Sequence, residues 1–370
     1  NDGVGNFQYL AGYEYGDTYI LGDGVQRGIS SIGMANPNLT WEEIKIQNIG
    51  LDFSLWNHRL YGETDAFYRE RTGIPVTRIT TLPSSFGEEL PPENLNSLNN
   101  RGFELKLGTK NHLRDLNWDI SGNISWSRAK WGHYEEPDYT DPDQKRIYTQ
   151  SGRWTDRQYG YLSDGLFTTQ EEIDNMEFEY QAGNDILNPG DIKYINLNGD
   201  SILDWRDQTE IGMGTRPNLV FGINIMFNYK NFDFSALFQG AAGYYHYVKL
   251  LQSIVYTKEM YDLRWTYENN DPEAFIPRLG GAGMNNAFSD HYYKKAGYLR
   301  LKALNIGYNL PNKFVERIQL KQVRFYFNGM NVFTFNQLKD YNIDPEAPSG
   351  NAGYYYPQQR TFTLGIIIKI

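Results

Sequence analysis

The 370-residue sequence has no cysteine, a deficit of basic residues and no long apolar run. Without cysteine the chain has no disulfides, which an extracytoplasmic protein with a large enough core does not need. Lys and Arg total 35 against 45 Asp and Glu, for a net charge of -10, so no basic patch is available to neutralise nucleic acid phosphates. No apolar segment approaches 18 residues, which excludes a membrane-spanning helix but not strands in which every second residue is polar.

Catalytic patterns are also missing. The 5 histidines are scattered, and neither an H-E-x-x-H metal motif nor a G-x-S-x-G nucleophile elbow occurs. Carboxylate pairs such as Glu171-Glu172 fall in predicted loops, where solvated charge explains them better than acid/base chemistry. We therefore predict that the protein is not an enzyme.

What the sequence does contain is a regular alternation of apolar and polar residues. Aromatic residues make up 15% of the chain and Gly contributes 36 residues, which favours strands and turns. In the clearest segment, 219–229, one face carries Leu219, Phe221, Ile223, Ile225, Phe227 and Tyr229. Its other face is rich in Asn and Gly. Strands with an apolar face ending in aromatic residues and an opposite polar face are typical of transmembrane β-barrels.

The alternation predicts nine strands. They span residues 43–56, 59–71, 99–110, 116–129, 217–229, 232–244, 296–309, 322–335 and 360–370. The connections alternate between short (57–58, 111–115, 230–231, 310–321) and long (72–98, 130–216, 245–295, 336–359). In an outer-membrane barrel short turns face the periplasm and long loops face outside. We therefore expect residues 1–42 outside and Ile370 in the periplasm.

An open sheet of about nine strands has two unpaired edges, which the hydrocarbon core of a membrane does not tolerate. The chain also begins at Asn1 without an initiator Met. We therefore expect residues 1–370 to be the C-terminal part of a larger barrel, with the N-terminal strands in sequence outside these residues. The fold class predicted is all-β, a transmembrane antiparallel barrel portion with long extracellular loops.

The long loops also carry patterns. Thr169-Gln170-Glu171-Glu172 has the spacing of a capping box and predicts a short helix, and 250–267 predicts another. Aromatic clusters occur at 244–247, 292–293 and 354–356, and at Trp154 near Tyr159 and Tyr161. They suit the stacking of sugar rings or peptide side chains, but membrane girdles, loop packing and a protein-docking surface are the favoured explanations.

One loop segment has the spacing of a calcium site. In the segment 196–207, positions 1, 3, 5, 9 and 12 of an EF-hand-like loop are oxygen-bearing, and position 7 offers a backbone carbonyl. These candidate ligands are Asn196, Asn198, Asp200, Asp204 and Asp207, with Ile202 as the carbonyl donor. Asn at position 1 and Ser201 at position 6 depart from the pattern. The alternative is an Asx-rich turn held by its own hydrogen bonds.

Several ordered segments resemble one family, the SusC/RagA-like TonB-dependent outer-membrane transporters of Bacteroidetes. The matching segments are Asn36-Pro37-Asn38-Leu39-Thr40-Trp41-Glu42, Asn99–Glu104, Gly165-Leu166-Phe167, Pro189-Gly190-Asp191, Asn196–Asp207, Gly297–Lys302, Gly307–Pro311, Tyr341–Glu346 and Tyr356–Thr361. Each motif is short, but together they run in order over nearly the whole chain.

The resemblance implies a 22-stranded barrel of which this chain supplies the C-terminal part, with the plug domain absent from it. It further implies import of oligosaccharides or oligopeptides across the outer membrane of a Gram-negative bacterium. The implied partners are a SusD-like lipoprotein at the extracellular mouth, TonB acting through the absent plug region, outer-membrane lipid, and a glycan or peptide ligand. No nucleic acid and no cofactor other than calcium is expected.

The alternative function is a secreted or surface all-β module for calcium-dependent binding or adhesion. Such a module predicts a water-soluble chain with both sheet faces packed. Strands with Trp and Tyr at their ends and an Asn- and Ser-rich opposite face argue against it.

Overall fold

The computed structural model describes residues 9–79, 85, 87, 90–248, 258–281, 283–349, 355–356 and 358–370. Nine long strands form one sheet in the order β19-β18-β17-β14-β13-β6-β5-β4-β3. Their bounds are β3 Glu43–Leu55, β4 Leu60–Thr77, β5 Pro92–Leu113, β6 Leu116–His133, β13 Leu219–Tyr229, β14 Phe232–Ala242, β17 Tyr298–Asn309, β18 Gln322–Asn336 and β19 Thr361–Lys369. The nine strands predicted from the alternation are therefore confirmed.

Shorter elements lie in the connections. The strands are β1 Tyr13–Leu21, β2 Gly24–Ser31, β7 Gln158–Gly160, β8 Ser163–Leu166, β9 Glu179–Tyr180, β10 Ile192–Tyr194, β11 Ile202–Leu203, β12 Thr209–Gly212, β15 Tyr245–Tyr247 and β16 Tyr293–Lys295. The helices are α1 Pro142–Tyr148, α2 Gln170–Asp174, α3 Lys258–Asp262 and α4 Asn312–Arg317, with 3-10 turns at Asn184–Ile186, Trp205–Asp207, Gly283–Asn286 and Lys339–Tyr341. Within the described ranges, no helix is both long and apolar enough to cross a membrane.

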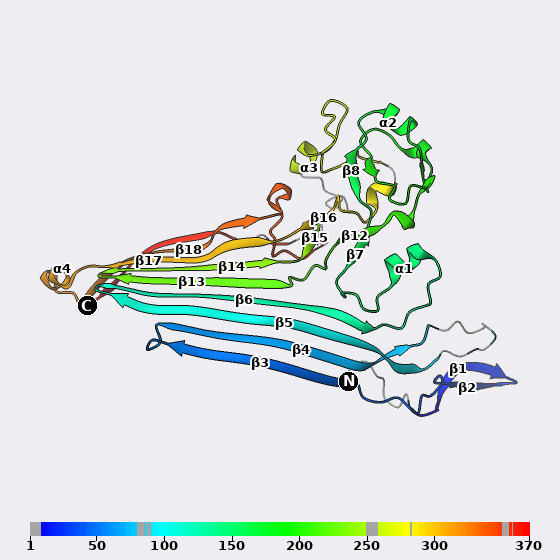
Figure 1. Cartoon of the computed structure of the whole chain (residues 1–370), viewed down its shortest axis with the longest axis horizontal. Helices are drawn as coiled ribbons and strands as arrows, with labels where there is room; N and C mark the ends of the chain where they lie inside the picture. Colours follow the sequence, from blue (N-terminus) through cyan, green and yellow to red (C-terminus); the bar gives the residue numbers. More distant parts are fainter. Residues whose placement is uncertain are drawn as a thin grey trace. The chain divides into compact units, whose positions relative to one another are not determined.

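The chain divides into two compact units. One comprises Asn1–Ile49, Ala66–Gly102 and Arg128–Thr155; the other comprises Gly50–Asp65, Phe103–Ser127 and Asp156–Ile370. The second unit holds all of β13, β14, β17, β18 and β19. Within it, β13, β14, β17 and β18 run side by side (Figure 1).

The register of these strands separates an apolar face from a polar one. Ile223 of β13 lies opposite Phe238 of β14, and Phe227 lies opposite Phe234, with the latter two ring centroids 6.1 Å apart. One residue on, Asn228 lies opposite Asp233, on the other face. Because successive side chains of a strand point to opposite faces of the sheet, every second residue of each strand contributes to the apolar face and the residues between them contribute to the polar face.

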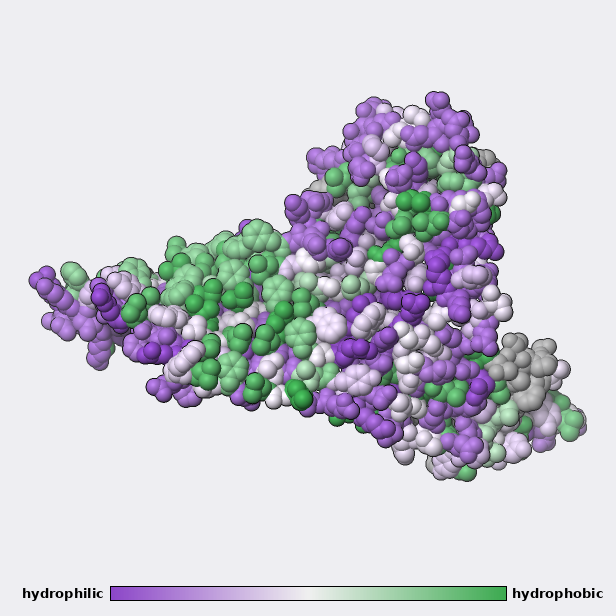
Figure 2. All heavy atoms as spheres, viewed as in Figure 1, coloured by the Kyte–Doolittle hydropathy of each residue, from purple (hydrophilic) through white to green (hydrophobic). Residues whose placement is uncertain are grey.

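The apolar face is exposed to its surroundings. On β19 the exposed fractions are 82% for Leu364 and 57% for both Ile366 and Ile368. Figure 2 shows apolar residues gathered over the strand part of the second unit. A water-soluble sheet would bury side chains of this kind, whereas a barrel strand turns them toward lipid.

Short and long connections fall at opposite ends of the strands. The Lys230-Asn231 turn joins β13 to β14, and Lys230 adopts a φ of +51° to make it. The segment between β17 and β18 contains α4, which lies at the end of the strands away from β15 and β16 (Figure 1). The predicted alternation of short and long connections is therefore present in the fold.

The predicted helices are found in part. Thr169 caps α2, and its Oγ1 accepts the backbone N–H of Glu172 at 3.3 Å, as the capping box predicts. Of the helix predicted over 250–267, only α3 is present among the described residues, and residues 250–257 lie outside them. Strands β4, β5 and β6 extend several residues beyond the stretches in which apolar and polar residues alternate.

Candidate functional site

A row of polar residues crosses the polar face of the sheet in the second unit. In register order it consists of Asn123 of β6, Gly222 of β13, Gln239 of β14, Arg300 of β17 and Thr334 of β18. The side chains of one row are neighbours on one face. The row therefore brings two amides and a guanidinium together, with a glycine between the two amides.

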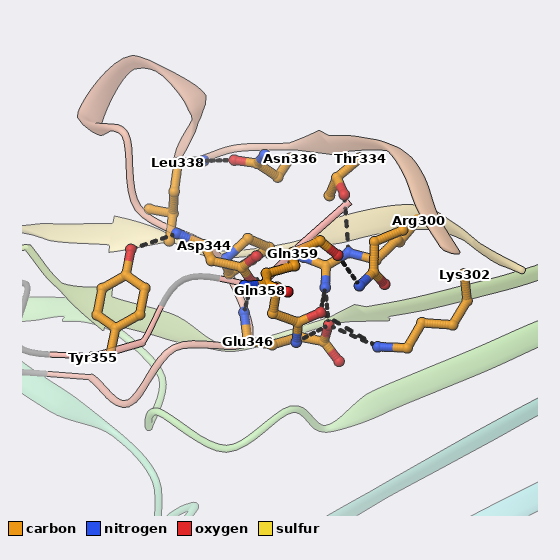
Figure 3. A network of polar contacts seen from close by, with 12 residues as sticks. Arg300, Lys302, Thr334, Asn336, Leu338, Asp344, Glu346, Tyr355, Gln358 and Gln359 are labelled. Carbon is orange, nitrogen blue, oxygen red and sulfur yellow. Dashed lines mark hydrogen bonds and ion pairs between the residues drawn. The ribbon is translucent and has the colours of Figure 1, made fainter. Parts of the chain in front are cut away.

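Arg300 is the most deeply buried member of this row. Its side chain is 2% exposed, and its guanidinium donates to both carboxylate oxygens of Asp344 at 2.8 and 2.7 Å. It also donates to Thr334 Oγ1 at 2.9 Å and forms an ion pair with Glu346. Figure 3 shows these groups converging between β17, β18 and the connection that follows β18. Two carboxylates from this connection are thus held by one strand arginine.

A β-bulge brings a second cation to the same carboxylate. Against β14, Leu301 and Ala303 of β17 pair with the consecutive residues Phe238 and Leu237, which leaves Lys302 as an extra residue. Against β18 the same two residues pair with Phe333 and Met330, so the register shifts there as well, with the longer stretch on β18. Lys302 Nζ lies 3.5 Å from the carboxylate of Glu346. Bulges re-aim side chains in this way. With Arg300, Lys302, Asp344 and Glu346 together, the cluster carries no net charge.

A cavity of about 550 Å³ opens beside this cluster on the polar face. Its lining includes Asn123, Gly222 and Gln239 from the row, together with Tyr298 and Glu346. The volume lies in the range of small-ligand sites in proteins.

The wall of the cavity is fixed by Tyr244, which follows β14. Its hydroxyl donates to the backbone oxygen of Pro345 at 2.9 Å, and burial raises the pKa of this hydroxyl. Burial lowers the pKa of His246, an effect that its hydrogen bond at the backbone of Pro345 partly offsets. His246 is therefore neutral near pH 7. Among the residues that the structure describes, Glu346 is the one charged group that lines the cavity.

The sequence-predicted calcium loop at 196–207 is closed by hydrogen bonds of its own. Asp207 is fully buried, and its Oδ1 accepts the backbone N–H groups of Leu197 and Asn198 at 2.8 and 3.3 Å. Its Oδ2 accepts the N–H of Asp204 at 2.9 Å. Asp204 in turn pairs with Arg206 at 2.8 Å.

The remaining candidate ligands point into the same turn. Asp200 Oδ1 accepts the N–H of Ile202 at 2.8 Å, and Asn196 donates to the backbone oxygen of Asp200 at 2.6 Å. Asn198 Nδ2 donates to Asp200 Oδ2 at 2.8 Å. Across the described part of the chain, no group of three or more His, Cys, Asp or Glu is arranged to hold a metal ion. These bonds fit the Asx-turn alternative, and calcium binding stays a prediction.

That prediction has a direct test. On the calcium interpretation, excess calcium raises the thermal stability of the wild-type protein, and Asp200→Ala removes the rise. At a concentration about 100 times Kd the expected gain is about 2.7 kcal/mol. Asp164→Ala, a substitution at a 62% exposed side chain in another part of the same long loop, is the control and keeps the response. Equal calcium affinity in the wild type and Asp200→Ala would remove the site.

The loops that carry this turn have a hydrophobic core of their own. Its buried members are Leu166, Phe167, Ile173, Tyr180, Leu187, Ile192, Tyr194, Leu203, Trp265, Ala274 and Tyr292. At its edge Asp191, which is fully buried, lies 2.8 Å from Arg278 Nε and accepts from Asn285 Nδ2 at 2.7 Å. The core thus joins residues of the segment 166–203 to Trp265, Ala274 and Tyr292, which lie far from that segment in the sequence.

The aromatic clusters of the loops mostly serve this packing. Tyr244 and Tyr292 are buried, and the rings of Tyr245 and Tyr293 stack with centroids 5.2 Å apart. In the other unit, Trp154 lies under the guanidinium of Arg128 at 4.6 Å. Tyr356 is exposed and Tyr354 lies outside the described residues. Loop packing, one of the favoured sequence interpretations, accounts for the buried members.

Comparisons with known proteins give the relatives of this chain. No protein-family model matches it. SusC of Bacteroides thetaiotaomicron, a TonB-dependent receptor, is 28% identical over 380 residues, covering 99% of this chain and 35% of SusC. TonB-dependent receptor P26 of Formosa agariphila is 29% identical over 371 residues, covering 93% of this chain and 36% of P26. Among solved structures, the RagAB peptide importer in its open-open state matches 99% of this chain and 38% of its own with a TM-score of 0.65 and 21% identity.

The chain is SusC/RagA-like. The structural match shows that its sheet has the fold of part of the RagAB barrel. A SusC/RagA-like chain of this length spans well under half of each relative named above. The relatives are named as receptors and an importer, which supports the prediction that the chain is not an enzyme.

Sequence patterns missed the residues at the centre of this site. Arg300, Asp344 and Glu346 fell within segments matched to the SusC/RagA-like family, yet no spacing rule joined them. The predicted strand 296–309 alternates less regularly than 219–229, and this irregularity is the one signal that the sequence offers. The bulge at Lys302 explains it.

Proposed function

We propose that this chain forms part of the wall of an outer-membrane, TonB-dependent nutrient importer. The single observation that carries the proposal is the two-faced sheet, whose apolar face is exposed over strands of about the length that crosses a bilayer. The similarity to SusC and to the RagAB peptide importer supports it. The polar face then lines the conduit.

The finer parts of the proposal follow from this assignment. The long connections face the outside of the cell and the C-terminus faces the periplasm. A SusD-like lipoprotein covers the extracellular mouth, and TonB supplies energy through a plug. Because the relatives are more than twice as long as this chain, the plug and the remaining strands come from sequence outside these 370 residues. The cargo is an oligosaccharide or an oligopeptide.

The adhesion module is the weaker alternative. It requires a soluble chain, and the exposed Leu364, Ile366 and Ile368 leave such a chain with a wide unburied apolar surface. Nothing in the geometry favours it over the importer.

A pair of lysine substitutions tests the proposal in the full-length protein. Ile223 and Met226 lie in β13 with exposed fractions of 41% and 42%, but on opposite faces of the sheet. A lysine facing the middle of the bilayer costs about 2–4 kcal/mol, whereas one facing the lumen does not. We expect Ile223→Lys to lower the amount of protein in the outer membrane and the uptake of cargo severalfold, and Met226→Lys to change both little.

Uptake is measured in a strain that lacks the gene, grown on oligosaccharides and oligopeptides as nutrients and complemented with each variant. Loss of growth on one class after deletion, restored by the wild type and by Met226→Lys, is the expected result. Equal amounts of Ile223→Lys and Met226→Lys protein in the outer membrane would contradict the proposal that β13 is part of a transmembrane barrel wall. Unchanged uptake of every nutrient after deletion would contradict import.

A further inference from the structure

The cavity beside Arg300 has a floor made by the glycine of the polar row. Asn123 and Gln239 flank Gly222, and a Cβ atom at Gly222 would lie 2.9 Å from Asn123 Oδ1. Glycine thus keeps open a space between two amides that any larger residue would narrow. The two amide side chains form no hydrogen bond within the described part of the chain, although each offers donors and an acceptor.

The charges around the cavity are already balanced. Glu346 lines it, but its carboxylate is paired with Arg300 and Lys302 and also accepts from Gln358 Nε2 at 3.0 Å. An oligopeptide brings a terminal ammonium and a carboxylate, each of which needs an ionic partner when it leaves water. In the described part of the cavity lining, no charged side chain is left without an ionic partner. An acidic sugar would therefore lack a partner for its carboxylate here as well.

The uncharged part of the lining suits a sugar. The Tyr298 and Tyr244 rings supply apolar surface, and Tyr244 is held in place by its bond to Pro345. Aromatic side chains combine an apolar body with a polar handle, which matches the apolar ring and polar rim of a pyranose. Free amides match hydroxyl groups, since both donate and accept hydrogen bonds.

We infer that this cavity is a subsite for a neutral carbohydrate segment of the cargo, an inference that rests on the proposed import function. A volume of about 550 Å³ accommodates a short stretch of such a chain. Glu346 and Arg300 then act as positioning residues. Their ion pair fixes the segment around Pro345 in the cavity wall, and neither side chain binds a charged group of the ligand.

The test uses the full-length protein in detergent and isothermal titration calorimetry. The probes are neutral gluco-, manno-, galacto- and xylo-oligosaccharides of four to six residues, a uronic acid oligosaccharide, and a neutral-side-chain pentapeptide. We expect at least one neutral oligosaccharide to bind, and Gln239→Ala and Gly222→Val each to weaken that binding about tenfold or more. Any binding of the uronic acid oligosaccharide or of the pentapeptide is expected to be unchanged by the substitutions at Gln239 and Gly222.

Two matched controls accompany these variants. Asn228→Ala removes another amide from the same face of β13, away from the cavity. Gly122→Val makes the glycine substitution on the neighbouring strand, where Gly122 lies opposite Ile223 on the apolar face. Both are expected to bind as the wild type does. Gln239→Ala removes an amide without adding volume to the cavity. Weaker binding by this variant therefore reports lost hydrogen bonding and not the distortion that Gly222→Val could cause.

Three outcomes overturn the inference: no neutral oligosaccharide binds, the cavity variants bind as tightly as the wild type, or the peptide binds and depends on Gln239. Uptake by the complemented strain distinguishes these from failure of the importer itself. If cells still require the gene for uptake while the cavity variants bind normally, the subsite is wrong and the importer stands. If the gene is not required for uptake of any nutrient, the importer is wrong.

Discussion

Arg300→Met is expected to release the connection 336–359 from the sheet and to destabilise the protein by about 3–5 kcal/mol. The substitution keeps a long side chain but removes the cation that Asp344 and Glu346 share, and it leaves two partly buried carboxylates with Lys302 alone. Uncompensated charge in such a position costs much more than the pair contributes when intact. Limited proteolysis within 336–359 and thermal unfolding in detergent measure the two effects.

Arg324→Met is the matched control. Arg324 pairs with Asp233 on the same face of the sheet, but its side chain is 28% exposed against 2% for Arg300. Solvent screens this pair, so we expect a loss of about 1 kcal/mol or less. The triple variant Arg300→Met, Asp344→Asn, Glu346→Gln also removes the two carboxylates that Arg300→Met leaves without their guanidinium. It is expected to recover part of the lost stability. Equal effects of Arg300→Met and Arg324→Met would show that burial of the cluster does not matter.

The strands of this fold were predictable because each one carries its own signal. In β13, apolar residues occupy all six positions of one face, and Gly or Asn occupies three of the five positions of the other. No other part of the chain is needed to recognise that pattern. The alternation of connection lengths follows from an antiparallel sheet in the same way. What the pattern did not give was the length of β4, β5 and β6, since their continuation depends on pairing with neighbours.

The polar site was not predictable because it joins residues that are far apart in the sequence. Arg300 meets Asp344 after 44 positions and Gln358 after 58, and no local rule relates them. The same holds in the loop core. Gly190 adopts a φ of +90°, and a Cβ there would lie 2.3 Å from the ring of Trp265. The segment Pro189-Gly190-Asp191 is therefore shaped by a contact across the fold, which its own residues do not reveal.

Asp191→Ala is expected to have the second large effect, confined to the loops. Asp191 has no exposed surface, and it holds Arg278 at 2.8 Å while accepting from the side chain of Asn285 and the backbone N–H of Asn188. Alanine leaves the guanidinium and two N–H donors without this acceptor. Removing one partner of a buried ion pair costs about 3–5 kcal/mol. We expect protease cleavage within the connections 130–216 and 245–295 at much lower protease concentration, with the strands of the sheet intact.

Asp164→Ala separates this effect from a general loss of loop charge. Asp164 pairs with Lys193 at 3.1 Å in the same loop region, but its side chain is 62% exposed and the lysine is 39% exposed, so the pair contributes about 1 kcal/mol or less. The protease sensitivity of Asp191→Asn is expected to lie between those of Asp191→Ala and Asp164→Ala. The amide keeps an acceptor for the backbone N–H of Asn188 but lacks the charge that balances Arg278. If Asp191→Ala and Asp164→Ala gave the same cleavage pattern, Asp191 would not anchor the loops. If proteolysis opened the sheet as well, loops and wall would unfold as one unit, contrary to the separate core the loops possess.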